Sequence, residues 1–156
     1  MKPLRGKVLV IGYGNPGRLD DGLGPALAEE VSRWRLDHVT VESCYQLAVE
    51  HAEQVARYDV VIFADADTKS PEPFRFDRLT ASLDVTFTTH SVAPEAILGL
   101  ARQIFQAKTE GYIIGIRGYE FDDFGESLSP RARGNLGAAA HFLQSALQPT
   151  ECEVGS

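Results

Sequence analysis

The chain has 156 residues, 44% of them apolar, and a net charge of −7 from 15 basic and 22 acidic side chains. This length fits one domain, and the apolar content is enough for a buried core without disulfides or a structural metal. The basic residues are scattered, which argues against nucleic acid and anionic membranes as partners. No apolar stretch approaches the roughly 20 residues that span a bilayer. Cys44 and Cys152 predict neither a disulfide framework nor a closed cysteine metal site, and they favour a reducing cytoplasm.

Strands and helices are predicted to alternate along the first half of the chain. Residues 7–13, 38–44 and 59–64 are expected strands; the first and third are continuous apolar runs, typical of strands covered by helices on both faces. A short helix is expected near 49–56. The helix between the first two strands, which begins at Asp21, places apolar residues on one face: Leu23, Leu27, Val31 and Trp34. In this βαβαβ order, right-handed crossovers bring the carboxyl ends of the strands to one edge.

The second half predicts an edge strand, a buried strand and two helices. Phe74 and Phe76 alternate with charged residues as in a short edge strand, and residues 112–116 form the last buried strand. One helix follows His90, with Ser91 as its N-cap. Its expected apolar face comprises Ile97, Leu100, Ala101 and Ile104. Ser129 and Pro130 begin the final helix, whose apolar residues are Leu136, Ala140, Leu143 and Leu147.

These elements predict a three-layer α/β/α fold of the phosphorylase/hydrolase-like kind. Its sheet should be twisted, mostly parallel and made of about five strands. We expect residues 1–148 to form one domain and residues 149–156 to form a flexible tail.

The glycine-rich turn Gly12-Tyr-Gly14-Asn-Pro-Gly17 has the G-x-G-x-x-G spacing of dinucleotide-binding sites. Here two carboxylates, Asp20 and Asp21, follow where a phosphate would bind, and they would repel it. The glycines are therefore interpreted as a tight turn that positions the two aspartates over the strand ends. The same string resembles the opening of peptidyl-tRNA hydrolases, but no histidine lies between Gly17 and His38 to serve as that family's base, and the net charge disfavours tRNA.

Three side chains are expected at one edge of the sheet. Asp21 begins the first helix, where either it or Asp20 can serve as an N-cap while the other faces the groove. Asp65 follows a buried strand directly, and a carboxylate there needs a metal, a cation or several donors. Asp67 is expected to form an Asx turn. His90 lies at a strand-to-helix junction, where a helix N-terminus favours neutral imidazole.

Two carboxylates and one neutral imidazole suit a divalent ion such as nickel, zinc or manganese. Three protein ligands leave positions open for substrate or water, which is typical of a functional rather than a structural site. No serine or cysteine nucleophile is evident, because the chain lacks a G-x-S-x-G turn and Cys44 has no predicted histidine partner.

Several motifs resemble the [NiFe]-hydrogenase maturation endopeptidases over about residues 7–147. They are VLVIGYGN, DDGLGPALAEEV, VVIFADADT, FTTHSVAPEAI and YEFDDFGESLSP, in the family's order. The resemblance implies a cytoplasmic protease that removes a C-terminal peptide from the large-subunit precursor of a [NiFe]-hydrogenase after nickel insertion. It also implies that Asp21, Asp65 and His90 recognise nickel carried by that substrate and take part in catalysis. The Asn15-Pro16-Gly17 turn is less usual for the family.

Two other functions remain open from the sequence. One is a nickel-sensing binding module or metallochaperone that has the same three ligands and does not hydrolyse its partner. The other is the peptidyl-tRNA hydrolase reading, which predicts a histidine-dependent esterase. The acidic, aromatic segment 119–126 is a candidate lining for the substrate groove, or a solvated surface loop.

Overall fold

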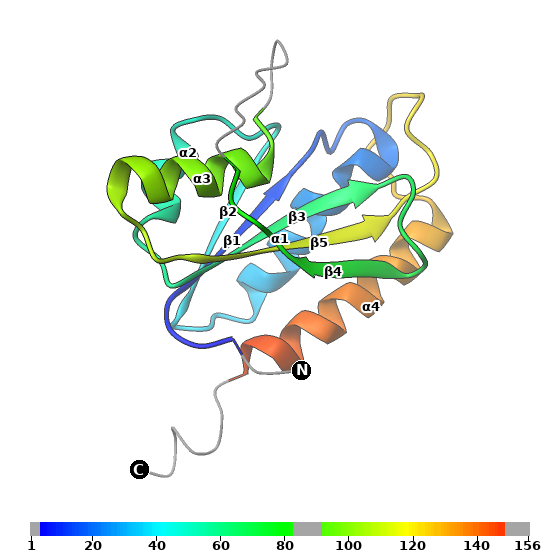
Figure 1. Cartoon of the computed structure of the whole chain (residues 1–156). Coiled ribbons are helices and arrows are strands. Elements are labelled where there is room, and N and C mark those ends of the chain that lie inside the picture. Colours follow the sequence, from blue (N-terminus) through cyan, green and yellow to red (C-terminus); the bar gives the residue numbers. More distant parts are fainter. Residues whose placement is uncertain (1–3, 83–91, 149–156) are drawn as a thin grey trace.

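The computed structural model describes residues 4–82 and 92–148, and its centre is a five-stranded sheet (Figure 1). The strands lie in the order β2-β1-β3-β5-β4. All neighbours pair in parallel except β4, which is antiparallel to β5 at one edge. The strand bounds are β1 Val8–Tyr13, β2 Val39–Cys44, β3 Val60–Asp67, β4 Phe74–Arg78 and β5 Glu110–Arg117.

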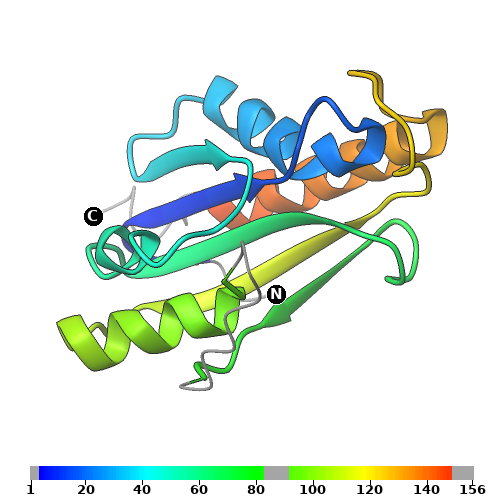
Figure 2. The same ribbon diagram turned by 90° about the horizontal axis from the view of Figure 1, so that it is seen from above.

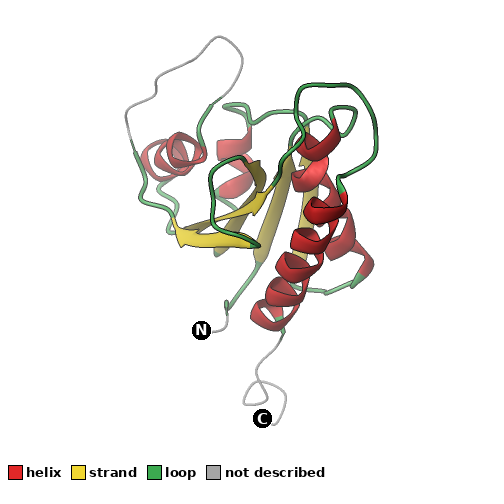
Figure 3. Cartoon of the chain, turned by 90° about the vertical axis from the view of Figure 1, so that its right-hand side faces the viewer, coloured by secondary structure: helices red, strands yellow, loops and turns green. Residues whose placement is uncertain are grey.

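Helices cover both faces of the sheet (Figure 3). Figure 2 shows α1 (Leu23–Arg33, blue) and α4 (Pro130–Leu147, orange) on one side, and α3 (Pro94–Phe105, green) on the other. The short α2 (His51–Val55) lies beside α3. Alternate strand residues therefore enter two separate cores: Val8, Val10 and Ile62 pack towards α1 and α4, whereas Leu9, Ile11 and Phe63 pack towards α2 and α3. The three-layer α/β/α prediction is confirmed.

The sequence placed some element boundaries wrongly. β3 continues to Asp67, so Asp65 lies inside the strand and not after it. A short 3₁₀ helix, η1 (Leu19–Gly22), precedes α1. α3 begins at Pro94 with Ala93 as its N-cap, so Ser91 is not the cap. Proline favours the first helical position, which explains the later start. Ile104, expected on the buried face, is 58% exposed, and the adjacent Phe105 is 46% exposed, so the last turn of α3 does not pack into the core.

No helix within residues 4–82 and 92–148 has the length and apolar character needed to cross a membrane. The predicted tail, 149–156, lies outside the described residues.

Candidate active site

Gly12 and Gly24 allow α1 to begin in direct contact with the sheet backbone. A Cβ atom on Gly24 would lie 2.4 Å from the carbonyl oxygen of Tyr13 and 2.5 Å from that of Ala64. A Cβ atom on Gly12 would lie 2.2 Å from the carbonyl oxygen of Gly24. Only glycine permits backbones to approach this closely. The segment that carries Asp21 is therefore fixed directly over the carboxyl ends of β1 and β3.

The glycine-rich turn folds around Asp21. The backbone N–H of Asn15 donates to Oδ2 of Asp21 at 2.8 Å. Gly14 has a φ of +139°, and a Cβ atom there would lie 2.1 Å from the Asp21 carbonyl oxygen. This confirms the interpretation of the glycines as a close-packed turn. Because the turn gives a backbone donor to a carboxylate, it is not arranged as a phosphate cradle.

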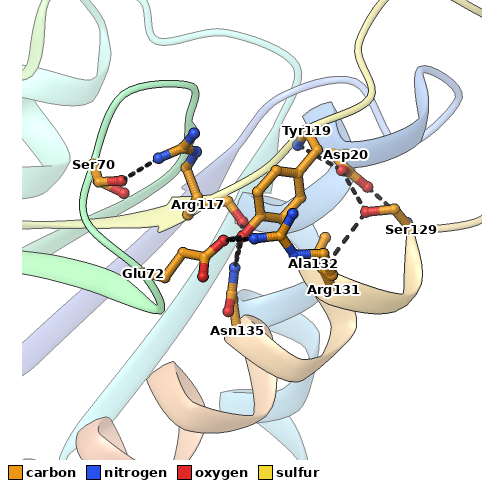
Figure 4. A network of polar contacts seen from close by, with 9 residues as sticks. All are labelled: Asp20, Ser70, Glu72, Arg117, Tyr119, Ser129, Arg131, Ala132 and Asn135. Atoms are coloured by element: carbon orange, nitrogen blue, oxygen red, sulfur yellow. Dashed lines mark hydrogen bonds and ion pairs between the residues drawn. The ribbon is translucent and has the colours of Figure 1, made fainter.

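Neither aspartate of the pair caps α1, whose N-cap is Gly22. Asp20 is instead completely buried and binds the 118–129 loop (Figure 4). Its carboxylate accepts the N–H groups of Tyr119 (2.8 Å), Glu120 (3.0 Å) and Ser129 (2.8 Å), and the Ser129 hydroxyl at 2.7 Å. Burial opposes ionisation of Asp20, but these hydrogen bonds outweigh it and lower the pKa of the carboxyl group.

The carboxyl group of Asp65 has a pKa near neutrality. Burial, together with the negative charges of Asp21 and Asp67, raises its pKa to about 7. Hydrogen bonding from the Tyr13 side chain and the Ala66 backbone opposes these effects. A carboxyl group with such a pKa is about half ionised at neutral pH, so it can both accept and donate a proton during a reaction.

Tyr13 was not identified from the sequence as a site residue. Gly12 pairs with Ala64 across β1 and β3, so Tyr13 lies beside Asp65 on the face covered by α2 and α3. Burial and the adjacent Asp65 carboxylate raise the pKa of Tyr13 far above its usual value. The hydroxyl group therefore stays protonated and serves as a donor to Asp65. Its position at a strand end was the available signal, but an aromatic residue there is more often part of the core.

Asp67 has a local structural role, as the sequence predicted. Its Oδ1 accepts the N–H groups of Lys69 (2.9 Å) and Ser70 (3.1 Å), which is an Asx-type turn, and its Oδ2 accepts Nε of Arg75 at 2.8 Å. Burial opposes ionisation of Asp67, but the hydrogen bonds and the Arg75 charge outweigh it and lower the pKa.

A second polar network holds the 118–129 loop against α4 (Figure 4). The Tyr119 hydroxyl donates to the Glu72 carboxylate and accepts from Nδ2 of Asn135 at 2.9 Å. The guanidinium groups of Arg117 and Arg131 lie over the Tyr119 ring, 5.3 and 4.4 Å from its centroid. This segment is therefore not simply a solvated surface loop, because Asp20 binds it on one side and Glu72 and Asn135 bind it on the other.

His90 lies outside the described residues, so its place relative to Asp21 and Asp65 stays a prediction. Within the described residues there is no group of three or more histidine, cysteine, aspartate or glutamate side chains that could hold a metal; the predicted site requires His90. Of the other histidines, Nε2 of His38 lies 2.9 Å from the Leu147 carbonyl oxygen, and Nδ1 of His51 accepts the Ala48 N–H at 2.9 Å. Neither binds at the strand ends.

Cys44 does not have the environment of a nucleophile. It is half buried at the end of β2. Burial and the neighbouring Glu42 charge raise the pKa of its thiol, so little thiolate forms at neutral pH. Cys44 is therefore a poor candidate for a nucleophile.

Comparisons with known proteins agree on one class of structure. No family model and no curated protein matches this chain. A [NiFe] hydrogenase maturation protease, HycI, from Thermococcus kodakarensis has a TM-score of 0.73 at 20% identity, covering 92% of this chain and 93% of its own. A hydrogenase 2 maturation peptidase from a thaumarchaeon has a TM-score of 0.67 at 26% identity, with 90% and 97% covered.

The hydrogenase maturating endopeptidase HybD from Escherichia coli has a TM-score of 0.63 at 20% identity, with 90% and 91% covered. The matches span nearly the whole length of both chains, so they concern the entire fold and not a shared motif. The structure thus confirms the resemblance that the motifs predicted: this chain has the fold of the [NiFe]-hydrogenase maturation proteases.

Proposed function

We propose that this protein is a cytoplasmic endopeptidase that removes a C-terminal peptide from the nickel-loaded large-subunit precursor of a [NiFe]-hydrogenase. The observation that carries the proposal is a carboxyl group, Asp65, near the carboxyl edge of the sheet, whose pKa is raised to about 7 by burial and by the nearby charge of Asp21. The matched solved structures, which are maturation proteases, support the same activity.

In this proposal, nickel held by the precursor is recognised by Asp21, Asp65 and His90, and nickel arrives as part of the substrate. Two oxygen donors and one nitrogen donor suit this borderline ion. The charge of Asp21 raises the cost of ionising Asp65, and a dication bound beside both carboxylates would remove that cost. A precursor without nickel would therefore leave the site unfavourable for docking, which makes cleavage depend on metal insertion.

Asp65 is assigned the proton transfers of hydrolysis. Its ionised form takes a proton from the attacking water as the water oxygen bonds to the scissile carbonyl carbon. The same group then returns the proton to the departing nitrogen as the carbon–nitrogen bond breaks, so the carboxylate is regenerated. The Tyr13 hydroxyl holds Asp65 in position through its hydrogen bond. Asp21, tied to the Asn15 N–H, serves as a fixed ligand towards nickel.

The experiment is a mass measurement on the cognate large-subunit precursor, nickel-loaded or metal-free, before and after incubation with this protein. We expect loss of a C-terminal peptide from the loaded precursor alone. Asp21→Ala should abolish the cleavage, whereas Asp37→Ala, which changes an exposed aspartate in the α1–β2 connection, should not. If the loaded precursor binds but keeps its full mass, the protein is a nickel-sensing binder and not a protease.

A further inference from the structure

A groove follows the outer edge of the sheet between β2 and α1, and it begins at the candidate site. Its larger cavity, about 610 Å³, lies between α1, the β2 residues Val41 and Ser43, and Glu126 and Leu128 of the 118–129 loop. A second cavity of about 210 Å³ reaches Gly14, whose backbone contacts Asp21. The two cavities share Pro16, Pro25 and Ser43 and therefore form one continuous path.

The sheet edge along this groove has backbone groups that face away from β1. The N–H of Val8 donates to the His38 carbonyl at 2.8 Å, and the N–H of Gly14 donates to the Cys44 carbonyl at 3.1 Å. Even-numbered residues of β2 therefore direct their backbone groups towards β1. Because these directions alternate along a strand, the N–H and C=O groups of Val41 and Ser43 point outward. β2 is the last strand of the described sheet, so its outer edge can accept another strand.

Space beside this edge is left by the small side chains of α1. Ala26, Ala28 and Ser32 line the larger cavity together with Pro25. A strand added next to β2 would lie beneath this face of α1, with its alternate side chains in the cavity. The groove thus offers both space and a hydrogen-bonding strand edge to one extended peptide segment.

The charges around the groove favour a basic segment. Glu126 lines the cavity, and Asp122 and Asp123 are exposed on the same loop. Glu29 also lines it but is paired with Arg33 at 2.8 Å. The nearby Arg18 is directed to the Phe121 carbonyl oxygen at 3.3 Å. Arg18 keeps its positive charge there, but the three carboxylates outnumber it, so the net charge beside the cavity is negative, and the protein as a whole carries −7.

We propose that an extended, positively charged segment of the precursor's C-terminal extension binds in this groove as a sixth strand beside β2. The proposal rests on the proposed function, since it concerns the substrate of the same site. A groove that leads away from Asp21 suits the chain on one side of the scissile bond. The extension is a chain terminus, so it can lie extended along the edge of the sheet.

Hydrogen exchange tests the strand pairing directly. The probe is a synthetic peptide with the sequence of the cognate precursor's C-terminal extension, added to the wild-type protein. The outward amides of Val41 and Ser43 should exchange at least tenfold more slowly with the peptide bound. The amides of Thr40 and Glu42 already face β1, so their exchange should change little.

Two matched pairs of variants test the groove during cleavage of nickel-loaded precursor. Ser32→Trp fills the cavity, whereas Ser145→Trp makes the same change at an exposed position of α4 outside it. We expect Ser32→Trp to raise KM at least tenfold with kcat within twofold, and Ser145→Trp to change neither. Glu126→Lys should raise KM about threefold or more, whereas Glu53→Lys on the opposite face of the sheet should not.

The outcomes separate the two proposals. If the wild-type protein cleaves the loaded precursor but either the exchange rates or the KM values stay unchanged, the groove does not hold the extension and the proposed function stands. If the wild-type protein removes nothing from the loaded precursor, the proposed function fails, and the binding of an extension as substrate fails with it.

Discussion

Replacing Asp65 by asparagine should stabilise the protein while abolishing cleavage. The pKa of Asp65 is raised from 3.8 to about 7 in the folded state, so the folded protein holds a proton that the unfolded chain has lost between pH 4 and 7. Its free energy of unfolding therefore falls as pH rises through that window. About 3 pKa units correspond to roughly 4 kcal/mol, which partial exposure of the side chain reduces to about 2 kcal/mol.

Urea unfolding of the wild-type and Asp65→Asn proteins at pH 4, 5, 6, 7 and 8 measures this effect. Asparagine cannot ionise and can still accept from the Tyr13 hydroxyl, so the variant should gain about 2 kcal/mol at pH 8 and almost nothing at pH 4. The depressed pKa values of Asp20 and Asp67 give a slope of opposite sign, but both proteins share it and it cancels. Parallel pH profiles would refute the assignment of Asp65 as a costly buried carboxylate.

Three further predictions concern positions around the site. His90→Ala should lower kcat/KM for loaded precursor at least a hundredfold, whereas His141→Ala, on an exposed face of α4, should leave it within twofold; a mass assay distinguishes them. Gly24→Ala places a Cβ against two carbonyl oxygens and should destabilise the protein by more than about 3 kcal/mol, whereas Gly134→Ala meets no atom within 4 Å and should stabilise it by up to about 1 kcal/mol in thermal unfolding. Asp20→Ala leaves three N–H groups without their acceptor and should cost about 3 kcal/mol or more in urea unfolding at pH 7; a cost below about 1 kcal/mol would contradict this.

Periodicity in the sequence was sufficient to predict the layers of the fold. Continuous apolar runs identified the buried strands β1 and β3, and alternation at Phe74 and Phe76 identified the edge strand β4. Ser129 was correctly predicted as an N-cap, and its side chain accepts the Ala132 N–H at 3.3 Å. These features depend on local sequence, and local preferences predict the structure correctly wherever tertiary contacts favour the same conformation.

The roles of the paired aspartates could not be read from the sequence. Two adjacent carboxylates at a helix start look alike, and either can cap. Asp20 was assigned to capping or the groove, but its partners are Tyr119, Glu120 and Ser129, about a hundred positions further along the chain. Likewise, the proximity of Tyr13 to Asp65 depends on the register of β1 against β3, which the two strand sequences alone do not specify.

The hydrogen bonds of Asp20 also determine when, during synthesis, the candidate site can finish folding. As the chain leaves the ribosome, the aspartate emerges early, while Ser129 emerges 109 residues later. The Tyr119 and Glu120 N–H groups emerge only about ten residues earlier, so for most of synthesis the Asp20 carboxylate has none of its donors and its burial is unfavourable. The rim of the site is therefore finished among the last events of synthesis, and a chain that stops before α4 would lack an intact site even though it contains both Asp21 and Asp65.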